Sequence, residues 1–283
     1  MNPYRIEGPA QLCFSGGRTS GYMLRKILDA HNGVLPPDVH TVFQNTGKER
    51  EQTLVFIHEV EQRWNVPVTW LEWDGFDGVR SKARFKVVTF DTASRNGEPF
   101  ARLIDDVGIL PNPLARICTA NLKVKTSAAY MRSLGYDEWD SVMGIRADEP
   151  RRVARMKAPG RDMRGGVPVL PLAQANVAKR DVLAFWKAQP FDLQLDPQGD
   201  LGNCDLCFLK SRAKLVNAIQ SEPRIVQWWI EQEKKHVVRG RAGLFRVDRP
   251  QYSELLREAQ FYARQLPLDL DDEPLTDCMC GGD

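Results

Sequence analysis

Hydrophobic and polar positions along the first seventy residues follow the pattern of strands that alternate with helices. A short apolar run at residues 11–14 ends in a glycine turn, and residues 19–31 then place apolar side chains on one helical face. Residues 40–43 and 68–71 read as two further strands, with a helix over residues 51–64 between them. This order predicts βαβ units and therefore a parallel sheet.

The same alternation continues to about residue 195, where the character of the chain changes. Residues 123–134 predict a helix, residues 140–145 a strand, and the segment from Val167 a strand followed by a helix from about Lys179. Beyond it, proline, glycine and paired cysteines precede two more helical segments, at residues 226–235 and 253–265. We expect a Rossmann-like α/β domain with flanking helices over residues 1–195 and a smaller helical, cysteine-bearing lobe over residues 196–283.

Composition excludes several classes of protein. A chain of 283 residues with 42% hydrophobic residues can bury one large core. Its 39 Lys and Arg against 37 Asp and Glu give a net charge of +2, so no global field recruits nucleic acid or an anionic membrane. No apolar run approaches the roughly 18 residues of a membrane span, and the first residues do not resemble a signal peptide. We therefore expect a cytoplasmic protein with no membrane partner.

The glycine turn after the first strand is the first candidate for chemistry. Gly16 and Gly17 let the chain turn tightly, so main-chain N–H groups can converge on a phosphate at the positive end of the following helix. Possible hydroxyl donors and one cation flank the two glycines: Ser15, Arg18, Thr19 and Ser20. The alternative interpretation is an ordinary strand-to-helix turn.

A charged turn follows the predicted strand at residues 140–145. Arg146, Arg151 and Arg152 can bind phosphate or sulfate oxygens, while Asp148 and Glu149 can hold Mg²⁺. Because the carboxyl ends of parallel strands share one edge of a sheet, we expect this turn to lie beside the glycine turn and the turn at residues 44–49. A solvated, self-paired loop is the alternative.

Cysteine spacing predicts a metal site. Six cysteines are too few for a disulfide scaffold in a chain of this length, but Cys204 and Cys207 form a CxxC and Cys278 and Cys280 a CxC. A CxxC turn directs two thiolates at one ion, and two further ligands complete a tetrahedral site. Zinc or an iron–sulfur cluster is compatible with this spacing, and unligated thiols are the alternative. Cys13 is expected to be a small buried side chain of the first strand.

Several motifs, in a consistent order, resemble those of a known superfamily. The run FSGGRTSGYML resembles the PP-loop of the adenine nucleotide alpha-hydrolase superfamily, and VFQNTGKEREQTLVFIHEV resembles the second motif of its phosphoadenosine phosphosulfate (PAPS) reductase-like branch. The resemblance continues through RICTANLKV, VMGIRADEPRR and VLPLAQANVAKRDVLAFW to GNCDLCFLK, and covers about residues 10 to 212. It implies a Rossmann-like sheet that binds ATP or a related adenine nucleotide.

The resemblance also implies roles for individual residues. Those that would contact phosphate are Ser15, Gly16, Gly17, Thr19 and Ser20, and those near the nucleoside are Asn45, Thr46 and Gly47. Thr19 stands where many PP-loops have aspartate, so metal or pyrophosphate handling differs. Lys123 would put a cation beside Cys118. The resemblance favours a [4Fe-4S] cluster over zinc, with Cys118, Cys204 and Cys207 as its ligands and Cys280 or Cys278 as a candidate fourth.

On this basis we expect an enzyme that uses ATP and Mg²⁺ for adenylation or sulfur transfer to an unidentified acceptor, with Arg146, Asp148, Glu149 and Lys123 as catalytic residues. Thioredoxin-dependent reduction of a sulfonucleotide is the second hypothesis, although the tail DCMCGGD lacks the glutamate and histidine of a reductase tail. The third is a non-catalytic module with a structural metal that binds nucleotide and nucleic acid.

The nucleic-acid hypothesis depends on the segment near Trp228 and Trp229. Two tryptophans close to four cations could stack on a nucleic acid strand, the cations being Lys234, Lys235, Arg239 and Arg241. An amphipathic helix with a buried tryptophan is the favoured interpretation. The sequence leaves the oligomeric state open, and a homodimer is one arrangement that it allows.

Overall fold

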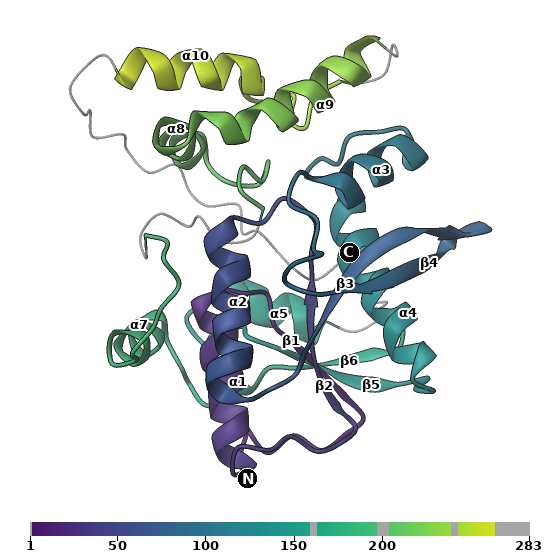
Figure 1. Ribbon diagram of the computed structural model, residues 1–283, viewed down its shortest axis with the longest axis vertical. Coiled ribbons are helices and arrows are strands. Elements are labelled where there is room, and N and C mark those ends of the chain that lie inside the picture. The colour runs from purple at the N-terminus through teal and green to yellow at the C-terminus, as the bar shows by residue number, and fades with distance from the viewer. Residues whose placement is uncertain (1, 159–162, 197–203, 239–242, 264–283) are drawn as a thin grey trace.

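A six-stranded sheet forms the centre of the molecule (Figure 1). The computed structural model describes residues 2–158, 163–196, 204–238 and 243–263. The sheet has the order β4-β3-β2-β1-β5-β6. Its strands are β1 (Ala10–Cys13), β2 (Val39–Gln44), β3 (Val68–Asp77), β4 (Val79–Val88), β5 (Trp139–Met143) and β6 (Gly166–Val169). All neighbours pair in parallel except β3 and β4, which form an antiparallel hairpin, so the predicted α/β class is confirmed.

The strand order reverses direction at β1. From β1 the chain moves outward through β2 and β3, and it then returns to the opposite side of β1 as β5. Ala10 is accordingly paired with both Val39 of β2 and Asp140 of β5. In open parallel sheets, ligands bind beyond the carboxyl ends of the strands at such a reversal. A ligand site is therefore expected at the residues that follow β1 and β5.

Helices cover both faces of the sheet (Figure 1). On one side lie α1 (Arg18–Ala30), α2 (Glu51–Trp64) and α7 (Lys179–Lys187), and on the other lies α4 (Thr126–Ser133), which continues a π-helix at Thr119–Lys125. The remaining helices before residue 195 are α3 (Glu98–Val107), α5 (Pro150–Lys157) and α6 (Pro171–Gln174). The largest apolar cluster joins the sheet to α1, α2 and α7, with Leu12, Ile27, Ile57 and Trp186 almost fully buried. Burial of each such side chain contributes about 1.5–3 kcal/mol to the free energy of folding.

Three longer helices and a 3₁₀ turn follow the sheet domain. They are α8 (Arg212–Ser221), Pro223–Ile225, α9 (Val226–Val238) and α10 (Tyr252–Ala263). A second apolar cluster unites these helices with α3 and β3, through residues such as Trp73, Phe100, Leu215 and Trp229. The helical character predicted beyond residue 195 is therefore confirmed, but these helices share their core with elements of the first 195 residues.

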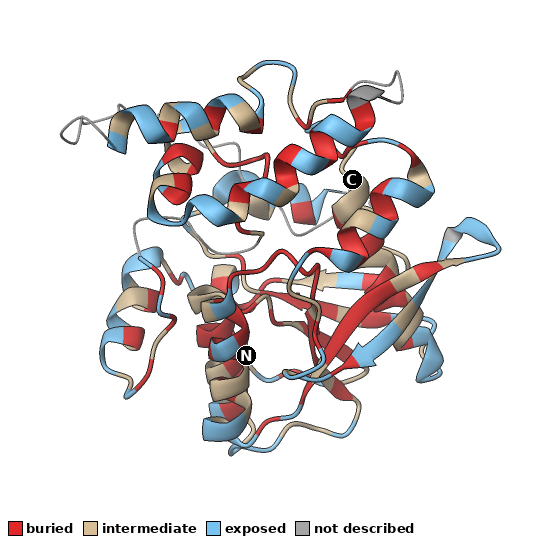
Figure 2. Cartoon of the chain, turned by 45° about the horizontal axis from the view of Figure 1, so that its top comes forward, coloured by how far each residue is buried: buried red, intermediate tan, exposed pale blue. Residues whose placement is uncertain are grey.

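Burial explains the pattern of hydrophobic positions. Figure 2 shows buried residues filling the central strands, whereas the helices carry buried and exposed positions in turn. α2 has the bounds that were predicted for it, residues 51–64. α1 begins and ends one residue earlier than the helix predicted over residues 19–31. None of the helices in the described ranges is long and apolar enough to cross a membrane.

Two predicted segments are longer or start earlier than expected. The helix expected from residue 123 is preceded by the π-helix from Thr119, and β3 runs to Asp77 instead of ending at residue 71. The sequence pattern also missed β4, α3, α5 and α8. The charged turn after β5 is short because Pro150 starts α5, a position where proline loses no helical hydrogen bond.

Candidate functional site

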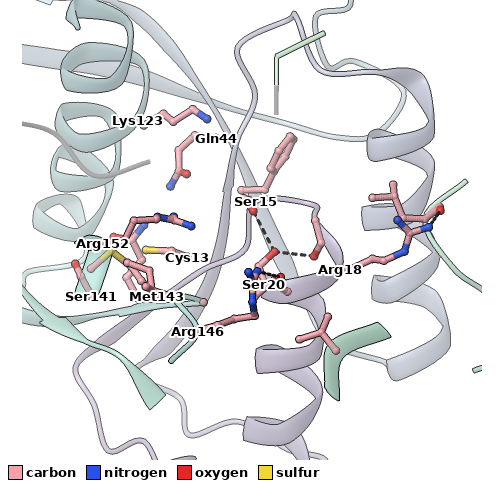
Figure 3. Close-up of a pocket in the computed structure, with 18 of the residues that line it drawn as sticks. Cys13, Ser15, Arg18, Ser20, Gln44, Lys123, Ser141, Met143, Arg146 and Arg152 are labelled. Carbon is pink, nitrogen blue, oxygen red and sulfur yellow. Dashed lines mark hydrogen bonds between the residues drawn. The ribbon is translucent and has the colours of Figure 1, made fainter. Parts of the chain in front are cut away.

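A cavity of about 320 Å³ opens beyond the carboxyl ends of β1, β2 and β5, where the strand order reverses (Figure 3). This volume lies at the lower end of the range of about 300–1,000 Å³ for small-molecule pockets. Ser15 after β1, Gln44 at the end of β2 and Arg146 after β5 all line it. The structure therefore brings together the three turns that the sequence placed on one rim.

Gly16 and Gly17 have different structural requirements. Gly16 has φ +72°, and an added Cβ would lie 2.6 Å from Cγ2 of Thr53 and 2.7 Å from Cδ1 of Ile57. Gly17 has φ −97°, and the nearest atom to an added Cβ is Oγ of Ser15 at 3.7 Å. Gly16 is thus needed for the fold itself, whereas Gly17 lines the cavity and keeps main chain open to it.

The start of α1 leaves its main-chain donors without a side-chain cap. No side chain within the described ranges caps this helix, although the amides of a first turn lack partners inside their own helix. The hydroxyls of Ser15 and Ser20 lie 3.1 Å apart, and Ser20 donates to the carbonyl of Gly17 at 2.9 Å. Gly17, Thr19 and Ser20 all line the cavity. The helix end can therefore accept an anion in the cavity.

Arg18 anchors a neighbouring segment and does not extend toward the centre of the cavity. Its Nε donates to Oδ1 of Asp192 at 2.8 Å, and its Nη2 donates to the carbonyls of Leu193 and Leu195. In Figure 3 its side chain extends away from Lys123, Gln44 and Arg152. The sequence analysis expected Arg18 to supply a cation at the phosphates. The structure shows that Arg18 instead holds the segment of Leu193 and Leu195, which line the cavity.

The charged turn after β5 forms a self-paired network whose arginine reaches the glycine loop. Arg146 Nε donates to Oδ1 of Asp148 at 2.8 Å, and its main-chain N–H donates to Oε2 of Glu149 at 3.0 Å. Nη1 of Arg146 also donates to Oγ1 of Thr19 at 3.3 Å, which ties this turn to α1. The two carboxylates therefore position a cation beside the loop.

Each carboxylate oxygen of Asp148 and Glu149 already has a hydrogen-bond donor. Oδ2 of Asp148 accepts the N–H of Lys179 at 2.9 Å, and Oε1 of Glu149 pairs with Arg152. Burial acts to raise the pKa of Asp148, but the Lys179 amide and the Arg146 guanidinium outweigh it and lower that pKa. To ligate Mg²⁺, as the sequence suggested, either carboxylate would have to release one of these donors.

Further cations face the cavity from three other elements. Arg152 of α5 and Lys179 at the start of α7 line it, and so does Lys123. Lys123 lies in the π-helix, a wide helical turn of a kind often found at functional sites. Several elements thus give one wall of the cavity a positive charge.

Polar side chains form an inner wall that the sequence analysis did not identify. Gln11 of β1 and Gln44 of β2 both donate from Nε2 to the hydroxyl of Ser127, and Ser141 lies opposite Gln11 in the sheet register. All four line the cavity. The available signal was a polar residue inside a short buried strand, where parallel sheets usually carry aliphatic side chains. Cys13 also lines this wall and is half-buried, so the expectation of a buried residue was wrong.

The second motif forms a network behind the cavity. Asn45 donates from Nδ2 to Oε1 of Glu72 at 2.7 Å, and its Oδ1 accepts the N–H of Gly47 at 3.1 Å. Thr46 donates its hydroxyl and main-chain N–H to Glu49. The residues expected near a nucleoside, Asn45, Thr46 and Gly47, are not among those that line the cavity, whereas the motif reaches it through Gln44 and Glu49.

Buried Glu49 and half-buried Cys204 lie close to each other and to Lys123. Burial raises the pKa of Glu49, although Lys123 and the Thr46 donors act in the opposite direction. Burial, followed by the Glu49 carboxylate, raises the pKa of the Cys204 thiol. The Cys204 sulfur also lies 3.4 Å from the Thr46 hydroxyl. The raised pKa favours the protonated form of this thiol.

The predicted metal ligands come together only in part. Cys118 is close enough to Cys204 to influence its pKa, whereas Cys207 has such an influence on Tyr252 of α10. Among the residues that the structure describes, no three His, Cys, Asp or Glu side chains converge as a metal-binding group. Cys278 and Cys280 lie outside the described residues. The metal site that the sequence suggested therefore stays a prediction.

Trp228 and Trp229 are part of the interior contacts of α9. Trp229 is fully buried and donates from Nε1 to Oδ1 of Asp205 at 2.8 Å. Trp228 packs on Phe100 and lies under the ammonium of Lys48, 5.2 Å from its ring centre. The favoured interpretation, an amphipathic helix with a buried tryptophan, is confirmed. Arg239 and Arg241 lie outside the described residues.

A comparison with known proteins identifies one relative. The chain is 34% identical over 214 residues to the "Uncharacterized nin region protein ORF290" of Escherichia phage lambda, and the match covers 74% of this chain and 69% of the phage protein. The chain belongs to the ORF290 family. The sequence matches no protein-family model. The name of the phage relative specifies no ligand or reaction, so function has to be argued from the cavity.

Proposed function

We propose that the cavity binds ATP or a related adenine nucleotide, and that the chain is a PP-loop-type enzyme of the PAPS reductase-like branch that performs adenylation or sulfur transfer. The observation that carries the proposal is the uncapped start of α1, where Gly17, Thr19 and Ser20 open onto a cavity at the reversal of strand order. The motif order from residue 10 to 212 supports the same function.

The charges around the cavity suit a polyphosphate. Main-chain amides at the start of α1 would hold one phosphate group, and Arg146, Arg152 and Lys123 would face its neighbours. These donors are held in place before the ligand arrives, Arg146 by Asp148 and Arg152 by Glu149. Preorganised donors of this kind stabilise the charge that develops on phosphate oxygens in a transition state.

The proposed reaction begins with attack on the α-phosphorus. A nucleophilic oxygen of the acceptor forms a bond to phosphorus, the α–β phosphoanhydride bond breaks, and pyrophosphate leaves with the bonding electrons. The acceptor proton passes to water. In the sulfur-transfer variant, a sulfur nucleophile then displaces AMP from the adenylated acceptor. Mg²⁺ would neutralise polyphosphate charge when it accompanies the nucleotide.

Equilibrium binding tests the nucleotide site. Calorimetric titration of the full chain with ATP should show saturable binding, and the Arg146→Ala/Arg152→Ala variant should bind at least tenfold more weakly, because two phosphate-facing cations are lost. The matched control is Arg25→Ala/Arg63→Ala, which removes two surface cations that pair with Asp29 and Glu59. Absence of ATP binding, or equal weakening in the control, would contradict the proposal.

Product analysis tests the reaction. Labelled ATP incubated with protein and candidate acceptors should yield pyrophosphate and an equal amount of AMP label, bound to the acceptor after adenylation or free after sulfur transfer. Saturable binding with release of ADP and phosphate instead would retain the site but reject the proposed cleavage between the α and β phosphates.

A further inference from the structure

The hairpin of β3 and β4 extends past the rest of the sheet (Figure 1). β2 pairs with β3 only between Val68 and Leu71, so β3 from Glu72 onward has β4 as its strand partner. β4 is also the edge strand of the sheet. The result is a two-stranded ribbon that lies outside the cavity and contributes none of its lining residues.

This ribbon carries a row of cations. Arg80, Lys82, Arg84 and Lys86 occupy alternate positions of β4, and all four are exposed. The register of β4 against β3 shifts on both sides of the Ala83–Phe76 pair, so the four cations lie along the ribbon at uneven intervals. With Arg102 of α3, which lies against the same ribbon, they are named here the basic ribbon.

Two of these five charges, Arg80 and Arg84, are held in position by main-chain carbonyls without being neutralised. Arg80 donates from Nη2 to the main-chain carbonyl of Asp106, and Arg84 donates from Nε and Nη2 to the carbonyl of Asp74, each at 3.2 Å. A carbonyl oxygen orients a guanidinium but does not cancel its charge. Lys82 makes no ion pair with any of the described residues, whereas Lys86 is paired with buried Glu72 at 2.9 Å.

Two guanidinium groups converge where β3 bulges. An added Cβ at Gly75, which has φ +95°, would lie 2.7 Å from Nη2 of Arg102 and 3.0 Å from Nη2 of Arg84. Asp74 is the carboxylate that pairs here, with its Oδ1 2.8 Å from Nη1 of Arg102. Two cations against one carboxylate leave a net positive charge at this bend, and forked guanidinium groups suit phosphate oxygens.

We propose that the basic ribbon binds the phosphate backbone of a nucleic acid duplex. A row of exposed cations complements a polymer of repeated phosphates, and a two-stranded ribbon has the width that the major groove of a duplex admits. The aromatic rings of the hairpin are engaged elsewhere, since Phe76 packs on Trp73 and Phe85 on Tyr130. Bases therefore find no stacking platform, and the binding is independent of sequence.

Cations on an edge strand have a second established use, which is to prevent strand pairing between molecules. One inward or edge charge is enough for that purpose, and glutamate serves it as well as lysine. A change from cation to glutamate therefore separates the two roles. A glutamate on β4 still protects the edge strand from pairing with another molecule, but its negative charge repels phosphate.

The test is fluorescence anisotropy of a labelled DNA duplex of mixed sequence, titrated with the full chain at several salt concentrations. The Lys82→Glu/Arg84→Glu variant should bind at least tenfold more weakly than the parent chain, and the slope of log affinity against log salt should fall by about one for each lost phosphate contact. The control is Lys187→Glu/Arg257→Glu, which has the same net charge but changes exposed cations on α7 and α10.

Several outcomes would overturn the proposal. They are equal weakening in the control, absence of salt-dependent binding by the parent chain, and binding of single strands or of an acidic peptide in preference to the duplex. If the double variant does not fold, Lys82→Gln is measured instead, with an expected loss of about one unit of salt slope. ATP binding should be unchanged in the ribbon variants, so the ribbon and the proposed nucleotide site can fail independently.

Discussion

At the rim of the sheet, residues of the same type differ in role: some maintain the loop and others face the cavity. Gly16 is surrounded by Thr53 and Ile57 and fits only because it has no side chain, whereas Gly17 borders open space. Arg18 and Arg146 are both arginines of the candidate site, but Arg18 is bound to Asp192 while Arg146 reaches Thr19. Position in the fold thus separates residues that maintain the loop from residues that face a ligand.

The two glycines should respond differently to substitution. Gly16→Ala places a Cβ at a positive φ and against two side chains, and should lower the free energy of unfolding by about 1–3 kcal/mol. Gly17→Ala meets no such contact and should unfold like the parent chain, but should bind ATP more weakly because its methyl group enters the cavity. Urea denaturation and ATP titration measure the two effects, and a destabilised Gly17→Ala with normal affinity would contradict this assignment.

At the scale of elements, a buried ion pair joins the turn before α2 to the turn before α8. Lys48 Nζ lies 2.9 Å from Oδ2 of Asp205, with side chains 7% and 6% exposed, and the Asp205 N–H donates to the Lys48 carbonyl at 2.7 Å. Oδ1 of Asp205 accepts from Trp229 of α9. One carboxylate therefore connects the sheet domain, the CxxC turn and the C-terminal helices.

Removal of that carboxylate should be costly. Asp205→Ala leaves the Lys48 ammonium buried without a counter-charge and should lower the free energy of unfolding by about 3–5 kcal/mol. Asp29→Ala breaks an exposed pair with Arg25 and should cost about 0–1 kcal/mol. Chemical denaturation of both variants provides the measurement. Similar costs for the two would show that the buried pair does not connect these elements.

At the scale of the whole molecule, the C-terminal helices share a core with α3 and β3, so their packing contributes to the stability of the entire chain. An ionisable group lies within that packing. Oε2 of Glu233 on α9 accepts the main-chain N–H of Tyr252 on α10 at 2.9 Å, and Glu233 is only 5% exposed. Burial raises the pKa of Glu233 from 4.5 to about 7, although the amides of Tyr252 and Phe245 lower it in part.

This raised pKa predicts lower stability at higher pH. Between 4.5 and about 7 the folded chain retains a proton that the unfolded chain has lost, so the contribution of Glu233 falls as pH rises through this range and is smallest above it. Glu233→Gln should reduce the loss of stability between pH 5 and pH 8. Glu231→Gln, an exposed position on the same helix, should leave it unchanged. Denaturation midpoints across this pH range decide the matter, and identical pH profiles for parent and Glu233→Gln would refute it.

The order of hydrophobic and polar residues was sufficient to determine the α/β class, the parallel arrangement of β1, β2 and β3, and the position of the glycine loop at the start of α1. These features follow from local periodicity, from the conformations that glycine permits and from the rule that parallel strands present their carboxyl ends at one edge. The meeting of Ser15, Gln44 and Arg146 at one cavity follows from the same rule.

Tertiary structure alone decided which candidates face the cavity. The sequence could not show that Arg18 is taken up by Asp192, that Asn45 and Thr46 point into a buried network, or that Cys207 lies near Tyr252. Each of these contacts joins residues that are distant in the chain or directed by side-chain conformation, and local periodicity carries no information on either. The basic ribbon became visible for the same reason, because only the pairing of β4 with β3 shows that its exposed cations lie along one hairpin.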